Sequence, residues 1–205
     1  YTGMVSRTDG FKLIKARSLA MQKAAENSSG AMFAIIGSTP ADIEKVCAET
    51  EGYVVPVNYN SSVQTVIAGE EAAAQAAADT LAAAGARAIR LNVAAAFHSK
   101  LMQGAADEFK PAAEQISFKT PEITMLSNIS GTVLGSIDNM PERLALHIVS
   151  PVKFTSELAY LSENGYDTFI ECGPGKVLTG LVKKTLKGVN AMNVQDADTL
   201  AKVIG

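Results

Sequence analysis

Two histidines, His98 and His147, can exchange a proton near neutral pH in this chain. His98 stands in the segment AAAFHSKLM, between an apolar run and a predicted helix. A loop there is a favoured position for a general base that activates a hydroxyl or thiol nucleophile. The alternative is a packed or capping histidine. His147, inside a predicted helix ahead of Ser150 and Pro151, fits that alternative better.

Arg17 is the candidate for binding an anion. In a helix, Leu13, Ile14, Arg17 and Met21 fall on one face, which would place the guanidinium among apolar side chains. A buried arginine requires an anion, and a bidentate contact with a substrate carboxylate would supply one. The alternatives are an internal salt bridge and an arginine extended along the surface.

Glycine-rich and amide-rich segments provide further candidates. The Gly-Pro-Gly of ECGPGKVLTGL stands at a strand-to-helix junction, where its N–H groups bind an anion or form a tight turn. Its spacing is not that of a Walker loop. Asn60 and Gln64, in NYNSSVQTVIAG, either hydrogen-bond a ligand or build a hairpin turn. Cys172 has no histidine near it in the sequence, so it is a poor candidate for a nucleophile.

The composition is that of a globular, mildly acidic protein. Its 205 residues are 47% hydrophobic and 19% charged with a net charge of −3, which predicts no nucleic acid or membrane partner. We expect no signal peptide, because the N-terminal segment has no apolar core. Two cysteines fit reduced thiols in a cytoplasmic protein, and two histidines far from both predict no metal site.

The segment from Gly30 to Asn92 has the clearest secondary-structure pattern. Short apolar or β-branched runs predict strands at 31–37, 53–60, 63–69 and 86–92. Helices are expected from about Pro40, with Ser38 or Thr39 as the cap, and between 70 and 85. The order β-α-β-β-α-β predicts a ferredoxin-like small lobe over residues 30–92. Pro56 predicts an edge strand or a bulge.

The flanking segments, residues 1–29 and 93–205, are expected to form a larger α/β lobe with a mostly parallel sheet. Helices are predicted at about 9–26, 99–115, from 141, 151–165 and 176–188, with a last one near the C-terminus. Strands are predicted at 122–128, 167–172 and 189–194. The small lobe would be an insertion into this larger one.

Taken in order, these segments resemble the malonyl-CoA:acyl-carrier-protein transacylase family. The resemblance rests on ARSLAMQ, GAMFAIIG, VNYNSSVQTVIAG, AFHSKLM, SPVKF and ECGPGKVLTGL, and runs from about Phe11 to the C-terminus. It implies an α/β-hydrolase-like large lobe that carries the inserted small lobe. It also implies malonyl transfer from malonyl-CoA to acyl carrier protein in fatty-acid synthesis, through an acyl-serine intermediate and without a cofactor.

The resemblance assigns roles to particular residues. His98 matches the catalytic histidine, and Arg17 matches the arginine that binds the malonyl carboxylate. Phe97 matches a bulky residue that leaves little room for an α-methyl branch, which favours malonyl over methylmalonyl. Asn60 and Gln64 match the motif that lines the cleft. His147 stands near a family glutamine that supports the catalytic histidine, and its ability to orient His98 is an open question.

The family's G-H-S-x-G elbow is not found in these 205 residues. We therefore expect the nucleophilic serine and part of the large sheet to be missing, and apolar faces to be uncovered as a result. A partial or cleaved chain, or one that pairs with the missing part, would explain this. Two alternative functions remain: a non-catalytic homologue that binds malonyl-CoA or carrier protein, and a thioester hydrolase. Arg17 argues against the hydrolase for simple acyl groups.

Overall fold

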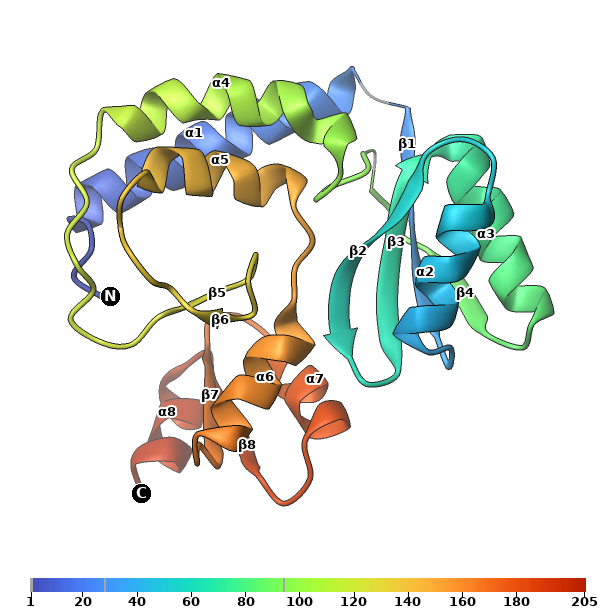
Figure 1. Ribbon diagram of the computed structural model, residues 1–205. Helices are drawn as coiled ribbons and strands as arrows, with labels where there is room; N and C mark the ends of the chain where they lie inside the picture. Colours follow the sequence, from blue (N-terminus) through green and yellow to red (C-terminus); the bar gives the residue numbers. More distant parts are fainter. Residues whose placement is uncertain (1, 28, 94) are drawn as a thin grey trace.

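The computed structural model describes residues 2–27, 29–93 and 95–205. The chain contains a four-stranded sheet. In Figure 1, this sheet and its helices lie beside a layer of long helices, and the C-terminal strands and helices lie below both. The α/β class predicted from the sequence is confirmed.

The four-stranded sheet follows the predicted β-α-β-β-α-β order. Its elements are β1 (Gly30–Ile36), α2 (Pro40–Glu49), β2 (Val54–Ser61), β3 (Gln64–Glu70), α3 (Glu71–Ala83) and β4 (Arg87–Arg90). The strands lie in the order β2-β3-β1-β4, and every neighbouring pair is antiparallel. The predicted hairpin is confirmed, since β2 and β3 pair with each other.

Local sequence signals explain where these elements begin and bend. The hydroxyl of Thr39 accepts a hydrogen bond from the N–H of Asp42, and Pro40 occupies the first turn of α2. Gly85, which follows α3, has a φ of +98°, a conformation that glycine adopts without strain. Pro56 lies on the edge strand next to a register shift, so both the predicted edge and the predicted bulge are present.

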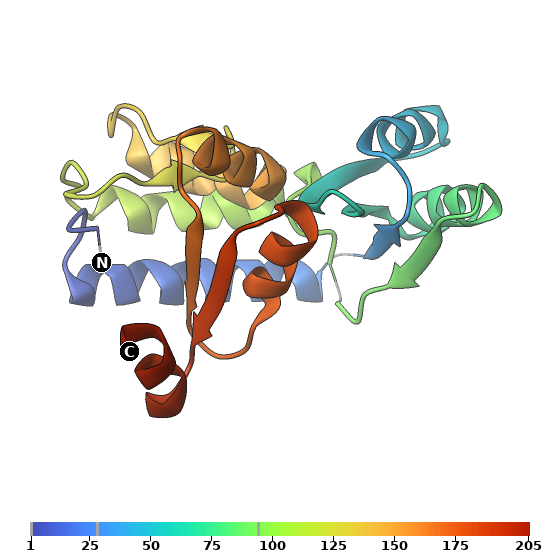
Figure 2. The same cartoon turned by 90° about the horizontal axis from the view of Figure 1, so that it is seen from below.

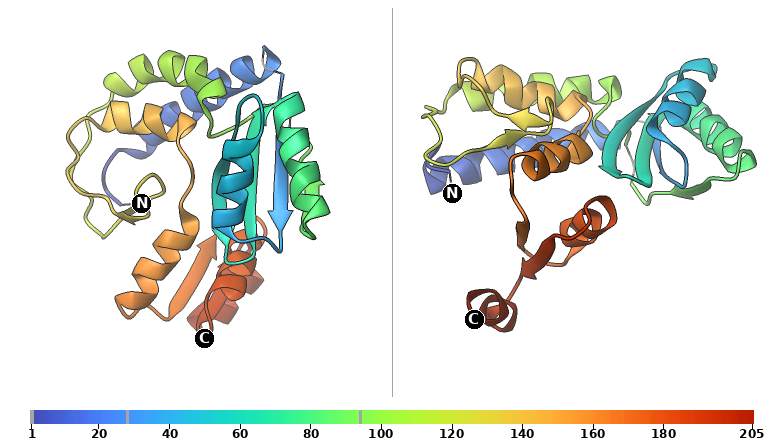
Figure 3. Two further views of the ribbon diagram at one scale, coloured as in Figure 1. Left: turned by 45° about the vertical axis from the view of Figure 1, so that its right-hand side comes forward. Right: turned by 60° about the horizontal axis from the view of Figure 1, so that its bottom comes forward.

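Both faces of this sheet are buried. Helices α2 and α3 cover one face, and Figure 3 shows them on the side turned away from the other helices. The alanines of α3 allow it to pack closely against Phe33, Ile35 and Ile67. The opposite face packs against Ala96, Phe97 and Leu101. The segment around His98 is therefore held directly against the sheet.

The helical layer consists of α1 (Arg7–Glu26), the short 3-10 helix η1 (Lys100–Met102), α4 (Gln103–Glu114) and α5 (Met140–Val149). Its core is built around Ala20, Met102, Phe109 and Ile148. The predicted helix from Ser99 is confirmed with one difference, because its first turn is η1 and Ser99 caps that turn. This layer holds both Arg17 and His147.

The C-terminal part contains α6 (Phe154–Glu163), β7 (Thr168–Cys172), α7 (Val177–Thr185), β8 (Asn190–Val194) and α8 (Ala197–Ile204). Strands β7 and β8 are parallel, and α8 lies away from the four-stranded sheet in Figure 2. Among the described residues they form a sheet of two strands, so the expected mostly parallel sheet is limited to this pair.

The predicted strand at 122–128 is largely wrong. Only β5 (Leu126–Ser127) is extended there, and it forms a small antiparallel hairpin with β6 (Thr132–Val133). Because this hairpin pairs with no other strand of the described part of the chain, nothing extends β5 beyond two residues.

Several large apolar side chains are uncovered, as the sequence led us to expect. Phe11 on α1 is 71% exposed, and Val177 on α7 is 72% exposed. Ile14 is 68% exposed, so its expected place on the buried face with Leu13 is wrong. The inward face of α1 instead carries Leu13, Ala16 and Ala20. Within the described residues, no helix is both long and apolar enough to cross a membrane.

Candidate active site around His98 and Arg17

His98 lies in a short loop with a constrained backbone. Its φ is +61°, a left-handed conformation that a residue with a Cβ adopts only at a cost. The buried hydroxyl of Ser99 donates to the carbonyl of Ala96 at 2.6 Å and accepts from the N–H of Leu101 at 3.2 Å. These two bonds close the turn and fix the direction in which the imidazole leaves the backbone.

The imidazole of His98 has a defined hydrogen-bonding state. Its Nδ1 lies 3.1 Å from the backbone carbonyl oxygen of His147. A carbonyl oxygen only accepts, so Nδ1 carries the proton and the neutral ring keeps a lone pair on Nε2. Burial lowers the pKa of His98 and outweighs the bond to the His147 carbonyl, which raises it, and the charge of Arg17 adds to the lowering. His98 is therefore neutral at pH 7 and able to accept a proton through Nε2.

His147 contacts His98 in two ways. Its backbone carbonyl accepts the Nδ1–H bond, and its ring centroid lies 5.4 Å from that of His98. Burial, followed by the charges of His98 and Arg17, lowers the pKa of His147 to about 4. Its Nε2 is buried and has no hydrogen-bond partner among the described residues. The contact that orients His98 thus comes from the backbone carbonyl of residue 147. This hydrogen bond does not require a histidine side chain at that position.

Arg17 is on α1, where its neighbours Ala16 and Ala20 pack in the same core as Phe97 and Ile148, and its charge lowers the pKa of both histidines. The guanidinium is half-buried, and burial also lowers its own pKa. Across the described stretches of the chain, no carboxylate forms an ion pair with it. The internal salt bridge left open by the sequence is therefore not observed there. The guanidinium keeps its hydrogen-bond donors for an external anion.

Phe97 connects the two halves of this site. Its ring packs against the core of the helical layer and also against the inner face of the four-stranded sheet. It therefore occupies the junction between them, next to His98.

Asn60 and Gln64 lie at the hairpin end of β2 and β3. Neither side chain has a hydrogen bond within the described residues, and none joins them to His98 or Arg17. Ser62, in the same turn, donates to the carbonyl of Lys184 at 3.1 Å, so this hairpin contacts the end of α7. Of the residues predicted from the sequence, the structure thus connects His98, Phe97, Arg17 and His147 by contacts or charge effects.

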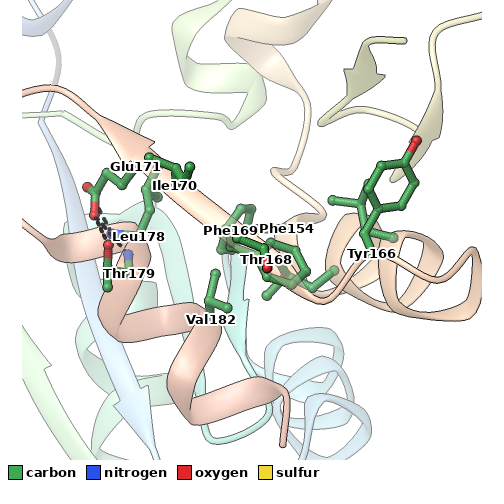
Figure 4. A pocket seen from close by; sticks show the side chains of 11 residues that line it. Phe154, Tyr166, Thr168, Phe169, Ile170, Glu171, Leu178, Thr179 and Val182 are labelled. Atoms are coloured by element: carbon green, nitrogen blue, oxygen red, sulfur yellow. Dashed lines mark hydrogen bonds between the residues drawn. The ribbon is translucent and has the colours of Figure 1, made fainter. Parts of the chain in front are cut away.

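The Gly-Pro-Gly segment is a turn whose helix N-terminus is already occupied. The carboxylate of Glu171 accepts hydrogen bonds from the N–H groups of Leu178 and Thr179 and from the Thr179 hydroxyl, at 2.8 to 3.1 Å (Figure 4). These bonds lower the pKa of Glu171. An external anion would have to displace this carboxylate, so the tight-turn interpretation is favoured. Cys172, the next residue, is exposed and free.

An apolar cavity of about 330 Å³ lies between α6, β7 and α7 (Figure 4). Phe154, Phe169 and Val182 line it, and it contains none of the predicted site residues. Two contacts that sequence reasoning missed lie elsewhere: Tyr53 touches the loop after His98, and Glu157 is buried in α6. Neither has a local sequence signal, because each depends on a partner far along the chain.

Comparison with known proteins decides the family. The model of the acyl transferase domain matches residues 1–204. The chain belongs to the acyl transferase domain family.

Members of this family resemble the chain in sequence and structure. It is 36% identical over 205 residues to the malonyl CoA-acyl carrier protein transacylase of Escherichia coli strain K12, covering 98% of the chain and 66% of that protein. Its counterpart in Bacillus subtilis strain 168 is 34% identical over 206 residues, covering 98% and 65%.

Two solved structures of transacylases are also similar to the chain in fold. A malonyl CoA-acyl carrier protein transacylase from Clostridium perfringens has a TM-score of 0.95 at 36% identity, covering 99% of the chain and 65% of that structure. A transacylase in complex with a type II PKS acyl-carrier protein has a TM-score of 0.92 at 34% identity, covering 98% and 66%. The chain thus spans just under two thirds of the length of these acyl transferases.

Proposed function

We propose that this chain carries the acid–base and carboxylate-binding parts of a malonyl-CoA:acyl-carrier-protein transacylase. The observation that carries the proposal is the pairing of a neutral, carbonyl-oriented His98 with an arginine that has no carboxylate partner among the described residues. A base for the nucleophile and a cation for a carboxylated acyl group are the two groups this transfer needs.

His98 would act first as a base and then as an acid in each of the two half-reactions. Its Nε2 takes the proton of a serine hydroxyl as the serine oxygen attacks the malonyl thioester, and it returns that proton to the departing CoA sulfur. In the second half it takes the proton of the carrier protein's phosphopantetheine thiol as the sulfur attacks the acyl-serine ester, and it returns the proton to the serine oxygen. The serine is assigned to no residue of this chain.

Arg17 and Phe97 would select the acyl group. The guanidinium binds the free malonyl carboxylate, which acetyl groups lack. Phe97, held between two packed cores, has little freedom to move aside for an α-methyl branch. Asn60 and Gln64 would line the approach of the longer CoA or phosphopantetheine portion, because their amides, at the β2–β3 hairpin, have no hydrogen bond among the described residues.

The proposal extends to fold, partners and location. We assign residues 30–92 to a ferredoxin-like small lobe, and residues 1–29 and 93–205 to an α/β-hydrolase-like large lobe. The strand order β2-β3-β1-β4 supports the first assignment. Acyl carrier protein and malonyl-CoA are the proposed partners in the cytoplasm, with no cofactor or metal required for the chemistry described.

Calorimetric titration with malonyl-CoA and acetyl-CoA tests the carboxylate clamp without requiring the serine. A charge-assisted bond contributes about 1.5–3 kcal/mol, so Arg17→Ala should weaken malonyl-CoA binding roughly 10- to 150-fold and change acetyl-CoA binding little. The control is Lys15→Ala, which removes an exposed positive charge from the same helix. Equal losses for both ligands would refute the clamp.

Intact mass after incubation with malonyl-CoA separates transfer from binding alone. An acyl adduct would place a nucleophile within these residues. Tight binding without an adduct would favour the non-catalytic alternative. Release of free malonate would instead favour the thioester hydrolase.

A further inference from the structure

The residue that follows the His98–Ser99 pair is held by a tyrosine from the four-stranded sheet. The backbone N–H of Lys100 donates to the Oη of Tyr53 at 3.1 Å. The Lys100 ammonium lies 4.0 Å from the centroid of the same aromatic ring, within cation–π range. Two independent interactions therefore join Tyr53 to one residue of the loop, 47 positions further along the chain.

Tyr53 is itself firmly attached to the sheet. Its N–H donates to the Glu70 carboxylate at 3.1 Å, and its carbonyl accepts from the Glu70 N–H at 2.8 Å. Gly69 packs so closely that a Cβ there would overlap the Tyr53 carbonyl oxygen. The backbone of Tyr53 thus moves with the end of β3, and its side chain reaches from that end to the loop of the active site.

The loop needs such support because its backbone is strained. A left-handed conformation is unfavourable for a residue with a Cβ, and His98 adopts it with a φ of +61°. Ser99 closes the turn internally, but its bonds to Ala96 and Leu101 lie within the loop and move with it. Tyr53 supplies a fixed point outside the loop on the sheet side, opposite the His147 carbonyl on the helix side.

We propose that Tyr53 is a positioning residue for His98, which couples the four-stranded sheet to the imidazole. While Tyr53 holds Lys100, the loop presents Nδ1–H to the His147 carbonyl and leaves Nε2 as the free base. When the Tyr53 hydroxyl is removed, the loop relaxes, the Nδ1–H bond loosens and both neutral tautomers become populated. The consequence of this coupling for catalysis rests on the proposed role of His98. The structural coupling between Tyr53 and His98 is independent of that role.

Nitrogen NMR of the histidine rings measures the tautomer populations of His98 directly, because the chemical shifts of the ring nitrogens differ between the two tautomers. His147 provides a second histidine signal in the same sample. The variant is Tyr53→Phe, which keeps the ring and removes the hydroxyl. We expect the wild-type His98 to be almost entirely in the Nδ1–H form and the variant to be a mixture. Carbethoxylation of His98 should also become several-fold faster as the loop opens.

Tyr59→Phe is the matched control. Tyr59 lies on β2 of the same sheet, and its hydroxyl donates to Glu44 at 2.7 Å instead of to the loop. Its variant should leave the His98 tautomer and the carbethoxylation rate unchanged. A shift of equal size in both variants would mean that sheet stability in general, and not the hydrogen bond from Lys100 to Tyr53, determines the state of His98, and the proposal would fail.

A second variant removes the partner of Tyr53 in the loop and serves if Tyr53→Phe does not fold. Lys100→Pro removes both the N–H donor and the ammonium, at the first position of η1, where proline is tolerated. Ser99 already has the extended backbone that proline favours in the preceding residue. This variant should also give the tautomer mixture, and an unchanged His98 signal in it would overturn the proposal. If the unaltered chain binds no malonyl-CoA while the Tyr53→Phe variant still shows the tautomer change, that result would refute the Arg17 clamp and leave Tyr53 as a positioning residue.

Discussion

Glu157 is a buried carboxyl group whose ionisation should make the protein's stability depend on pH. Its side chain, on α6, is 8% exposed, and the amide of Asn128 donates to it at 2.9 Å. Burial raises the pKa of Glu157 to about 7, against the opposing effect of that hydrogen bond. The pKa in the unfolded chain is near 4.5.

The sign of the effect follows from these two pKa values. Between pH 4.5 and 7 the unfolded chain has released the proton while the folded protein still holds it, so folding stability falls as pH rises through this range. Below it the full stability is present, and above pH 7 the loss is complete. A difference of about 2.5 pKa units sets an upper limit near 3 kcal/mol. Relaxation around the charge reduces this to about 1–3 kcal/mol.

The perturbation is Glu157→Gln, which keeps the shape and an acceptor oxygen for Asn128 but carries no charge. Urea unfolding followed by circular dichroism should show little change at pH 4.5. At pH 8 we expect a gain of about 1–3 kcal/mol, a midpoint shift of roughly 0.5–1.5 M. Glu163→Gln, at the exposed end of the same helix, is the control. The same stability change at both pH values, or a loss at pH 8, would refute the reasoning.

Four further predictions test the packing and the site. Gly69→Ala should destabilise the protein by more than about 3 kcal/mol in urea unfolding, because the new Cβ would overlap the Tyr53 carbonyl. Gly180 lies inside α7, and a Cβ added there would meet no neighbouring side chain or strand within 4 Å. Gly180→Ala should therefore stabilise the protein by about 0.5–1 kcal/mol. Equal changes in unfolding free energy for the two glycine variants would contradict both predictions. Proton NMR should show His147 unprotonated at pH 5.5, since its pKa is about 4, whereas a midpoint above 6 would mean that the ring is solvated. His147→Gln should leave the His98 Nδ1–H tautomer in place, because the bond is to a backbone carbonyl.

Local signals allowed most of the elements to be predicted from the sequence. The start of α2 depends on Thr39 and Pro40, and the end of α3 on Gly85, all within a few residues of the boundary they set. The hairpin of β2 and β3 follows from two β-branched runs around one short turn. The error at 122–128 has a different cause, because a short strand needs a neighbour to pair with and the sequence does not reveal that neighbour.

The site was predicted in part. The types of residue suited to acid–base chemistry and anion binding, His98 and Arg17, were identified from the sequence, and the structure brings them together. The sequence did not predict that the Glu171 carboxylate occupies the start of α7, because the two are joined only when the turn closes. It also left the way in which His147 supports His98 undecided, and the structure provides that contact through the backbone.

The sequence by itself determined most of the elements of this protein and the side chains available for chemistry, because periodicity and capping act over short distances along the chain. Only the tertiary structure decided the state of those side chains. His98 is bonded to a carbonyl 49 residues away, and Lys100, two residues after it, is held by a tyrosine 47 residues away. Burial between the sheet and the helical layer lowers the histidine's pKa. Hydrogen-bond direction and desolvation depend on which surfaces pack together, and the chain sets those only by folding.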